Sequence, residues 1–347
     1  MERLYEENPH QGDGYRATVL DELKGIIARR IKEAQSVRQA YFTPDYSSVE
    51  TYSRTTEEYR QQYKQMLGWP LCPLEPALQE NTEEVFVAED DLGRIYRMRI
   101  PVMEGLRAYG ILFLPKGKGP FPLVITQHGG LGTPERVGGF FGSANYHDMV
   151  RRVLRQGAAC FAPQLYLWSA DYGPQMDRAH MEHQLKLLGG SFASLETLMV
   201  MRSIDALCRK PQLDSSRVGM LGLSYGGLYT LLVAAADPRI RVACSSCAFH
   251  DQLTVKMSDW GWYNAANRFT LVEISKLICP RALYIEVADK DELFDCRDAE
   301  LAAPEVIAAY EKLGIAREFS FSVFSGVHEL SQGPQIIDFL MAHLKKG

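Results

Sequence analysis

Residues 218–228 have the sequence VGMLGLSYGGL, and this stretch decides the fold. Its first four residues are apolar or glycine and favour a buried strand, whereas the apolar run from Leu228 to Ala236 favours a helix. Ser224 therefore lies where a strand must turn sharply into a helix, and glycines two positions before and after it avoid side chains that would collide there. This context predicts Ser224 as a nucleophile, with the amide of Tyr225 free to donate to a developing oxyanion. The alternative is a glycine-rich turn without chemistry.

A serine hydroxyl needs a general base, and a neutral histidine suits that task near neutral pH. His328 follows the late apolar run at 319–324 and precedes a final amphipathic stretch that carries Ile336, Ile337 and Leu340. A histidine after the last strand completes the chain order serine, acid, histidine that this arrangement requires. We therefore predict His328 as the base.

The acid is expected after the preceding apolar run, in the loop 288–295. Asp291 is preferred because it precedes an apolar pair that would anchor the loop. Asp289, beside a lysine, is typical of a solvated turn, and Glu292 and Asp295 are further options. Only geometry separates these carboxylates.

A second glycine-containing loop, His128-Gly129-Gly130, follows the apolar run at 123–126. Glycines there let the backbone approach a substrate, and we expect the amides of Gly129 and Gly130 to complete an oxyanion hole with that of Tyr225. His128 is expected to shape the loop rather than to transfer protons. The side chains that we consider for lining a substrate pocket are His128, Trp168, His250 and Trp260, although packing is the commoner use of aromatic residues.

Short apolar runs alternate with helical stretches through most of the chain. After an antiparallel opening at about 85–114, such runs occur at 123–126, 158–162, 218–221, 242–245, 282–287 and 319–324. Near-continuous apolar strands separated by helices indicate an α/β fold with a mostly parallel central sheet covered on both faces. We expect residues 83–347 to form the catalytic domain, with a lid-like insertion around 164–190.

Residues 1–82 are expected to be a helical extension. Leu23, Ile26, Ile27, Ile31 and Ala34 recur at helical spacing, and a second helix is predicted from the capping-box pattern at 55–58 to Gly68. Each helix has one apolar face that must be buried, so the extension should pack on or cap the main body, or form a homo-oligomer contact.

Composition limits the classes of partner. The 347 residues are 46% hydrophobic and 23% charged, with a formal net charge of -5 and no block of like charges, so neither nucleic acid nor an anionic membrane is expected. The N-terminus lacks the apolar stretch of a secretory signal, and no segment approaches the roughly 18 apolar residues of a membrane span. These features predict a cytoplasmic protein.

The seven cysteines are scattered, which argues against a disulfide scaffold. Cys244 and Cys247 have the spacing of a metal or redox pair, but no second pair or pair of histidines follows, so core packing is favoured. The sequence has no His-Glu-x-x-His pattern. We expect neither a metal nor an organic cofactor.

From about Glu84 to its C-terminus the chain resembles the α/β-hydrolase superfamily, and within it the dienelactone hydrolase, acetyl xylan esterase and prolyl oligopeptidase-like branches. The motifs that carry the resemblance are His128-Gly129-Gly130, the turn at 222–227, Asp237-Pro238-Arg239-Ile240, Asp291-Glu292-Leu293-Phe294 and Gly326-Val327-His328. The resemblance implies a serine hydrolase of carboxylic esters with Ser224, Asp291 and His328 as its triad, acting on a small acyl or carbohydrate ester.

Two departures narrow this implication. Dienelactone hydrolases proper are similar but carry cysteine at the position of Ser224, and the oligopeptidases usually carry a β-propeller that the short N-terminal segment cannot form. A peptidase or amidase with the same triad remains one rival hypothesis. A non-catalytic binding module on the same fold is the other.

Overall fold

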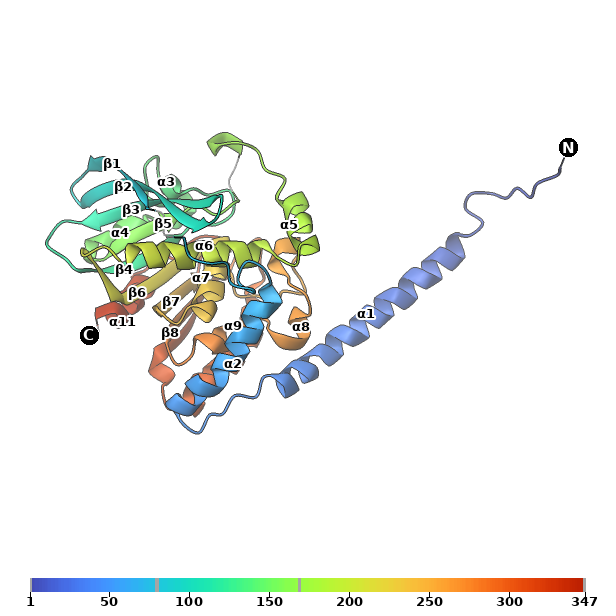
Figure 1. Cartoon of the computed structure of the whole chain (residues 1–347). Helices are drawn as coiled ribbons and strands as arrows, with labels where there is room; N and C mark the ends of the chain where they lie inside the picture. The colour runs from blue at the N-terminus through green and yellow to red at the C-terminus, as the bar shows by residue number, and fades with distance from the viewer. Residues whose placement is uncertain (1, 79–80, 168–169, 346–347) are drawn as a thin grey trace.

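The computed structural model describes residues 2–78, 81–167 and 170–345. A nine-stranded sheet has the order β1-β2-β3-β5-β4-β6-β7-β8-β9 (Figure 1). Its strands are β1 (Glu83–Glu89), β2 (Gly93–Met103), β3 (Leu106–Pro115), β4 (Phe121–Gln127), β5 (Ala159–Pro163), β6 (Leu213–Leu223), β7 (Ile240–Ser246), β8 (Ala282–Ala288) and β9 (Phe319–Phe324). Each predicted apolar run lies within or overlaps one of them.

The pairing of the strands changes once across the sheet, from antiparallel to parallel. β1, β2 and β3 pair in antiparallel fashion, and β3 pairs antiparallel with β5. From β5 through β4, β6, β7 and β8 to β9 every pairing is parallel. The carboxyl ends of these strands therefore meet at one edge, where ligands bind in open α/β sheets. The predicted α/β-hydrolase architecture is confirmed.

Helices cover both faces of the sheet, as expected. The helices are α1 (Asp13–Tyr41), α2 (Val49–Leu67), α3 (Pro134–Val137), α4 (Met149–Arg155), α5 (Arg178–Leu187), α6 (Phe192–Leu207), α7 (Tyr225–Ala236), α8 (Ala265–Arg268), α9 (Leu271–Ile278), α10 (Cys296–Lys312) and α11 (Gln335–Lys345). One hydrophobic cluster gathers side chains of α2, α6, α7, α9 and α10, and a second gathers those of α4 and α11.

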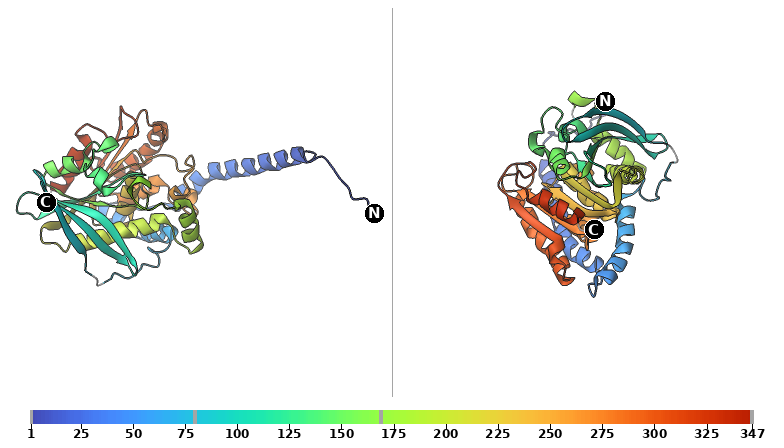
Figure 2. Two further views of the ribbon diagram at one scale, coloured as in Figure 1. Left: turned by 90° about the horizontal axis from the view of Figure 1, so that it is seen from above. Right: turned by 90° about the vertical axis from the view of Figure 1, so that its left-hand side faces the viewer.

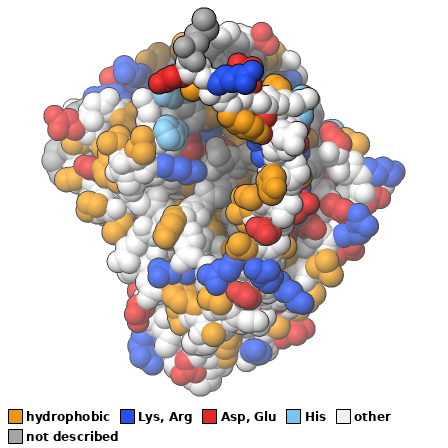
Figure 3. Space-filling model, turned by 90° about the vertical axis from the view of Figure 1, so that its right-hand side faces the viewer, with side chains coloured by type: hydrophobic (Ala, Val, Ile, Leu, Met, Phe, Trp, Pro, Cys, Tyr) orange, Lys and Arg blue, Asp and Glu red, His pale blue; other side chains and the backbone are white. Residues whose placement is uncertain are grey.

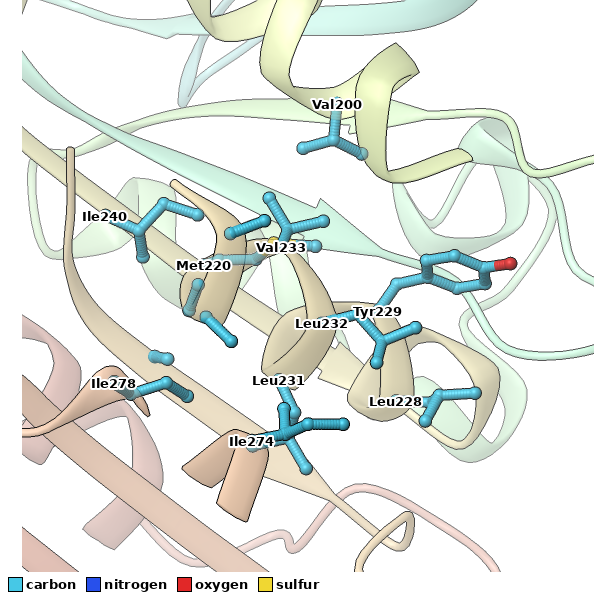
Figure 4. Packing of buried hydrophobic residues seen from close by; sticks show 14 of the residues in the cluster. Val200, Met220, Leu228, Tyr229, Leu231, Leu232, Val233, Ile240, Ile274 and Ile278 are labelled. Atoms are coloured by element: carbon cyan, nitrogen blue, oxygen red, sulfur yellow. The ribbon is translucent and has the colours of Figure 1, made fainter. Parts of the chain in front are cut away.

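Helix α7 lies at the centre of the first cluster. Every one of its residues is buried, because α6 and α9 pack against it while it rests on β6 and β7. Figure 4 shows Leu231 and Val233 of this helix among Met220 of β6 and Ile274 of α9. Helix α7 is thus packed on all sides, and this packing holds Ser224, which directly precedes the helix, in one position.

Helix α2 is longer than predicted. It begins at Val49 rather than at the pattern around Thr55, because the Ser48 hydroxyl accepts a hydrogen bond from the Thr51 amide and caps the helix there. The hydroxyl of Thr55 instead bonds back to the Thr51 carbonyl inside the helix. The end at Gly68 is as predicted. Tyr52, Tyr63 and Leu67 are buried against the body.

Helix α1 behaves differently from the expectation that both apolar faces are covered. It projects from the body and carries the N-terminus at its far end (Figures 1 and 2). Ala34 is buried at the foot of the helix, where α1 contacts α8, but Leu23 and Ile27 are about half exposed, at 51% and 50%. The body offers no surface along the outer part of the helix.

Across the described ranges, no helix combines the length and the apolar character that crossing a bilayer requires.

Candidate active site

Ser224 lies at the turn between β6 and α7, with φ of 60° and ψ of -123°. A non-glycine residue at positive φ is strained, and this strain is typical of a nucleophile held at a sharp turn. The glycines beside it are required by space: a Cβ at Gly222 would lie 2.2 Å from the Gly226 carbonyl oxygen, and one at Gly226 would lie 2.1 Å from that of Gln127. The Ser224 amide donates to the Ser246 carbonyl at 2.9 Å, which fixes the turn on β7.

The structure brings His328 and Asp291 together. His328 Nδ1 lies 2.8 Å from Asp291 Oδ2, and both side chains are nearly buried. Burial alone would raise the pKa of Asp291, but the hydrogen bond and charge of His328, with the amides of Leu293 and Phe294, hold that pKa below its ordinary value. Asp291 is therefore an anion that accepts a hydrogen bond from Nδ1–H of His328 and leaves Nε2 for another partner. Nε2 is buried and has no hydrogen-bond partner among the described residues.

The other carboxylates of the 288–295 loop have different tasks. Asp289 accepts from the Gly326 amide at 3.0 Å, while its own amide donates to the Phe324 carbonyl. Glu292 lies 3.3 Å from the His328 amide. Asp295 caps α10. Asp289 thus fixes the two loops to each other, and Asp291 is the carboxylate that contacts the histidine ring.

A buried carboxylate that sequence reasoning missed anchors the loop of His328. Glu286 of β8 accepts from the hydroxyl of Ser246 at 2.8 Å, from the hydroxyl of Ser331 at 2.8 Å and from the Ser331 amide at 3.0 Å. Burial raises the pKa of Glu286 above its ordinary value, although these donors oppose the shift. An acid within the apolar run ALYIEVA of β8 was the available signal.

The three predicted oxyanion donors differ. The Gly129 amide donates to the Tyr146 hydroxyl at 3.0 Å, so this amide already has a partner and the prediction for Gly129 needs correction. The Gly130 amide donates to no described residue. Tyr225 is the first residue of α7, where an amide has no acceptor within the helix. Gly130 and Tyr225 remain the candidate pair.

His128 does not line a pocket. It is fully buried, its Nδ1 lies 2.7 Å from the Gly129 carbonyl oxygen, and its Nε2 accepts from the Leu165 amide at 2.9 Å. Burial lowers the pKa of His128 to about 4, so the ring stays neutral. This is the loop-shaping role that we expected, and it removes His128 from the substrate-lining candidates.

A chain of aromatic rings connects His328 to the turn at Ser224. Phe294 lies 5.6 Å from the His328 ring, His250 stacks on Phe294 at 4.4 Å, and Trp260 lies 5.0 Å from His250 and 4.9 Å from Tyr225. We call His250, Trp260 and Phe294 the aromatic wall. Trp260 Nε1 and both ring nitrogens of His250 are buried without a partner in the described part of the chain. Burial lowers the pKa of His250 to about 4.

A buried ion-pair cluster ties the start of α5 to the body. Arg178, the first residue of α5, contacts Glu196 at 2.8 Å and Asp259 at 2.7 Å. Asp259 also accepts from the Tyr225 hydroxyl at 3.0 Å. The start of α5 is thus connected to the residue that follows Ser224. Trp168, the other residue that we predicted here, lies outside the described residues.

Cys247 directly follows β7 and lies close to Asp291 and His328. Its Sγ and the ligand atoms of Asp291 and His328 all lie within 4.8 Å of one another. Burial raises the pKa of Cys247 to about 12, so it carries a neutral thiol, which donates to the Glu329 carbonyl at 3.3 Å. Cys244 is buried within β7.

Known proteins resemble both the sequence and the fold. The protein YtaP of Bacillus subtilis strain 168 is 26% identical over 218 residues, which are 58% of this chain and 71% of YtaP. A glucuronoyl esterase from Solibacter usitatus superposes with a TM-score of 0.62 at 13% identity, over 88% of this chain and 98% of that one. Acetyl xylan esterase 1 from Thermoanaerobacterium sp. JW/SL YS485 has a TM-score of 0.58 at 17% identity, over 90% and 98%. A sequence profile of the dienelactone hydrolase family matches residues 110–326, more than half of the chain, and the protein belongs to this family.

Proposed function

We propose that the protein hydrolyses carboxylic esters, with Ser224 as nucleophile, His328 as general base and Asp291 as the acid that orients the base. The observation that carries the proposal is the 2.8 Å contact between His328 and Asp291, at the sheet edge where Ser224 is held in a strained turn. Membership of the dienelactone hydrolase family supports the same reaction class.

The reaction proceeds by acyl transfer. His328 Nε2 takes the hydroxyl proton as Ser224 attacks the ester carbonyl, and the imidazolium then gives that proton to the departing alkoxide. The amides of Tyr225 and Gly130 donate to the oxyanion, and removing such a donor typically costs about 3 kcal/mol of barrier. Water then attacks the acyl-enzyme by the same steps and regenerates Ser224.

The surroundings favour a neutral ester. The guanidinium of Arg178 lies 5.8 Å from the Tyr225 ring, but Glu196 and Asp259 already neutralise it. It is therefore not free to bind a substrate carboxylate. Trp260 and His250 of the aromatic wall are buried, at 1% and 4% exposed, so they shape the surroundings of Phe294 and His328 without adding a charge there. Acetyl esters of sugars, the substrates named for one of the structural relatives, are our first choice.

Replacing the nucleophile tests the proposal. We expect Ser224→Ala to reduce hydrolysis of p-nitrophenyl acetate by about 10⁴-fold or more and to abolish labelling by a fluorophosphonate probe. Ser215→Ala, on the exposed part of β6, is the matched control and should retain both. Full activity of Ser224→Ala, with its fold intact, would contradict the assignment. If the wild type does not react with the probe, the protein is a binding module.

A substrate panel then separates the reaction classes. We expect neutral acetylated sugars and short acyl esters to be cleaved faster than esters that carry a free carboxylate, because Arg178 is already paired with Glu196 and Asp259. Faster cleavage of aminoacyl amides than of every ester would identify an amidase or peptidase instead.

A further inference from the structure

Helix α1 carries an apolar stripe that the body leaves uncovered. We define the stripe as Val19, Leu20, Leu23, Ile26, Ile27 and Ile31, whose exposed fractions run from 42% to 62%. Their spacing places them on one face of the helix. Such a face on an isolated helix is unstable in water unless another surface covers it.

The same face is already used for packing at the foot of the helix. Ala34 is 3% exposed, Tyr41 meets Phe269 edge to face at 5.5 Å, and Arg38 pairs with Glu273 at 3.0 Å. The stripe continues this buried face outward for about three turns with nothing against it. This face of α1 therefore carries apolar side chains along most of its length, and only those at its foot are covered by the body.

A groove of about 280 Å³ extends the stripe onto the body. Ile31 and Ala34 of α1 form one side of it, and Leu253, Leu271 and Leu301 form the other. Leu301 is 80% exposed and Leu253 is 49% exposed. A partner that lies along the stripe therefore finds further apolar surface at its foot.

The charges beside the stripe indicate the partner. The exposed charged residues of the outer helix are Asp13, Arg16, Asp21, Glu22, Lys24, Arg29, Arg30, Lys32 and Glu33, and the two signs are interspersed. The face of the molecule from which α1 projects also carries charged side chains of both signs (Figure 3). An anionic membrane selects helices whose polar face is rich in Lys and Arg. Flanks of both signs instead suit a second helix of the same kind, because charges of opposite sign can face each other across a helix pair.

We propose that α1 pairs side by side with α1 of a second copy of this chain through the apolar stripe. An antiparallel pair related by a two-fold axis buries the same six residues of both copies. Leu23 lies near the middle of the stripe, so this arrangement brings the two Leu23 side chains close together. The paired helices lie outside the two bodies, so the pairing does not involve the sheet edge that holds Ser224.

Analytical ultracentrifugation of the full chain tests the pairing. We expect the wild type to sediment at twice the 39.1 kDa chain mass and Leu23→Glu/Ile27→Glu to sediment at the mass of one chain. Ala28→Glu is the matched control, because Ala28 lies on the opposite side of the helix and is exposed. Both substituted residues of the double variant are solvent-exposed in the single chain, so its thermal unfolding and ester hydrolysis report whether the body is intact.

Complementary charges identify the contact itself. Leu23→Glu and Leu23→Lys chains should each be monomeric, and mixing them should restore the dimer. A wild type that remains monomeric at every concentration would overturn the proposal, as would a mixture that fails to reassociate. Co-sedimentation of a monomeric wild type with phosphatidylserine vesicles, lost in Leu23→Glu, would assign the stripe to a membrane and also overturn it.

Discussion

Asp291 and Asp289 stand two positions apart in one loop, and their hydrogen bonds separate them. Asp291 contacts His328 Nδ1, whereas Asp289 contacts the Gly326 amide. We expect Asp291→Asn to lower kcat by about 10³- to 10⁴-fold, because an amide no longer stabilises the imidazolium. Asp289→Asn keeps an oxygen that can accept from Gly326 and should lose less than tenfold. Steady-state kinetics on p-nitrophenyl acetate measures both, and equal losses would contradict the assignment of the acid.

The order of motifs along the chain predicted Ser224, His328 and the loop of the acid, because each follows a recognisable apolar strand. The sequence alone did not exclude Asp289 as the acid, because neighbouring carboxylates of one loop differ only in where their side chains point. The sequence also led us to assign the Gly129 amide to the oxyanion hole. Nothing near Gly129 in the sequence indicates that this amide donates to the hydroxyl of Tyr146, seventeen positions later. Contacts across such separations depend on the folded geometry.

Glu286 of β8 accepts hydrogen bonds from Ser246 of β7 and from Ser331 in the loop after β9, and so holds this loop on the sheet. Its role is to position elements of the fold rather than to take part in the reaction. We expect Glu286→Ala to reduce kcat more than tenfold with little change in KM, and to lower the free energy of unfolding by about 3 kcal/mol, since three buried donors lose their acceptor. Glu286→Gln keeps one acceptor oxygen and should lose less of both. Ser331→Ala, which retains the amide contact, should lie between wild type and Glu286→Ala.

Kinetics and urea denaturation of these variants distinguish positioning from stability. Normal kcat in a destabilised Glu286→Ala protein would show that the carboxylate only supports the fold.

The cap of α2 offers a second prediction for a single element. Ser48→Ala removes the acceptor for the Thr51 amide and should lower the free energy of unfolding by about 1 kcal/mol. Ser53→Ala, an exposed serine inside the same helix, should change it by less than half of that amount. Urea unfolding measures both. The capping-box pattern at 55–58 misplaced the start of this helix because those threonine hydroxyls bond within the helix instead.

For the whole molecule, acid sensitivity follows from two buried histidines. His128 and His250 have pKa values lowered by burial to about 4, whereas the ordinary value is 6.5. The unfolded chain therefore binds protons first as pH falls below 6.5, and the folded state loses stability down to about pH 4. Each histidine should cost on the order of 2 kcal/mol between about pH 7 and pH 5.

The His250→Phe variant checks this slope. Phenylalanine keeps the ring against Phe294 and removes two nitrogens that have no partner in the described residues, so stability at pH 7 should be equal or higher. Urea unfolding across this pH range should show a shallower decline than in the wild type. An unchanged slope would mean that His250 does not contribute.

The mostly parallel sheet and both covering layers could be expected from alternating apolar runs, because burial on two faces leaves a strong signal in the sequence. The exposure of the apolar residues on the outer half of α1 could not be expected from the sequence. Its apolar positions recur at the spacing of a packed helix, and the pattern does not reveal whether the surface that covers it belongs to the same chain.

Arg178 joins the insertion around α5 to the body by charge as well as by packing, through Glu196 and Asp259. The segment around α5 is therefore held to the body by a few charged side chains, and these can be substituted without changing the sheet. In evolutionary terms, we expect substitutions at this point to reshape the segment around α5 while the proposed acyl-transfer groups stay in place. Substrate range and reaction chemistry can then diverge separately within one family.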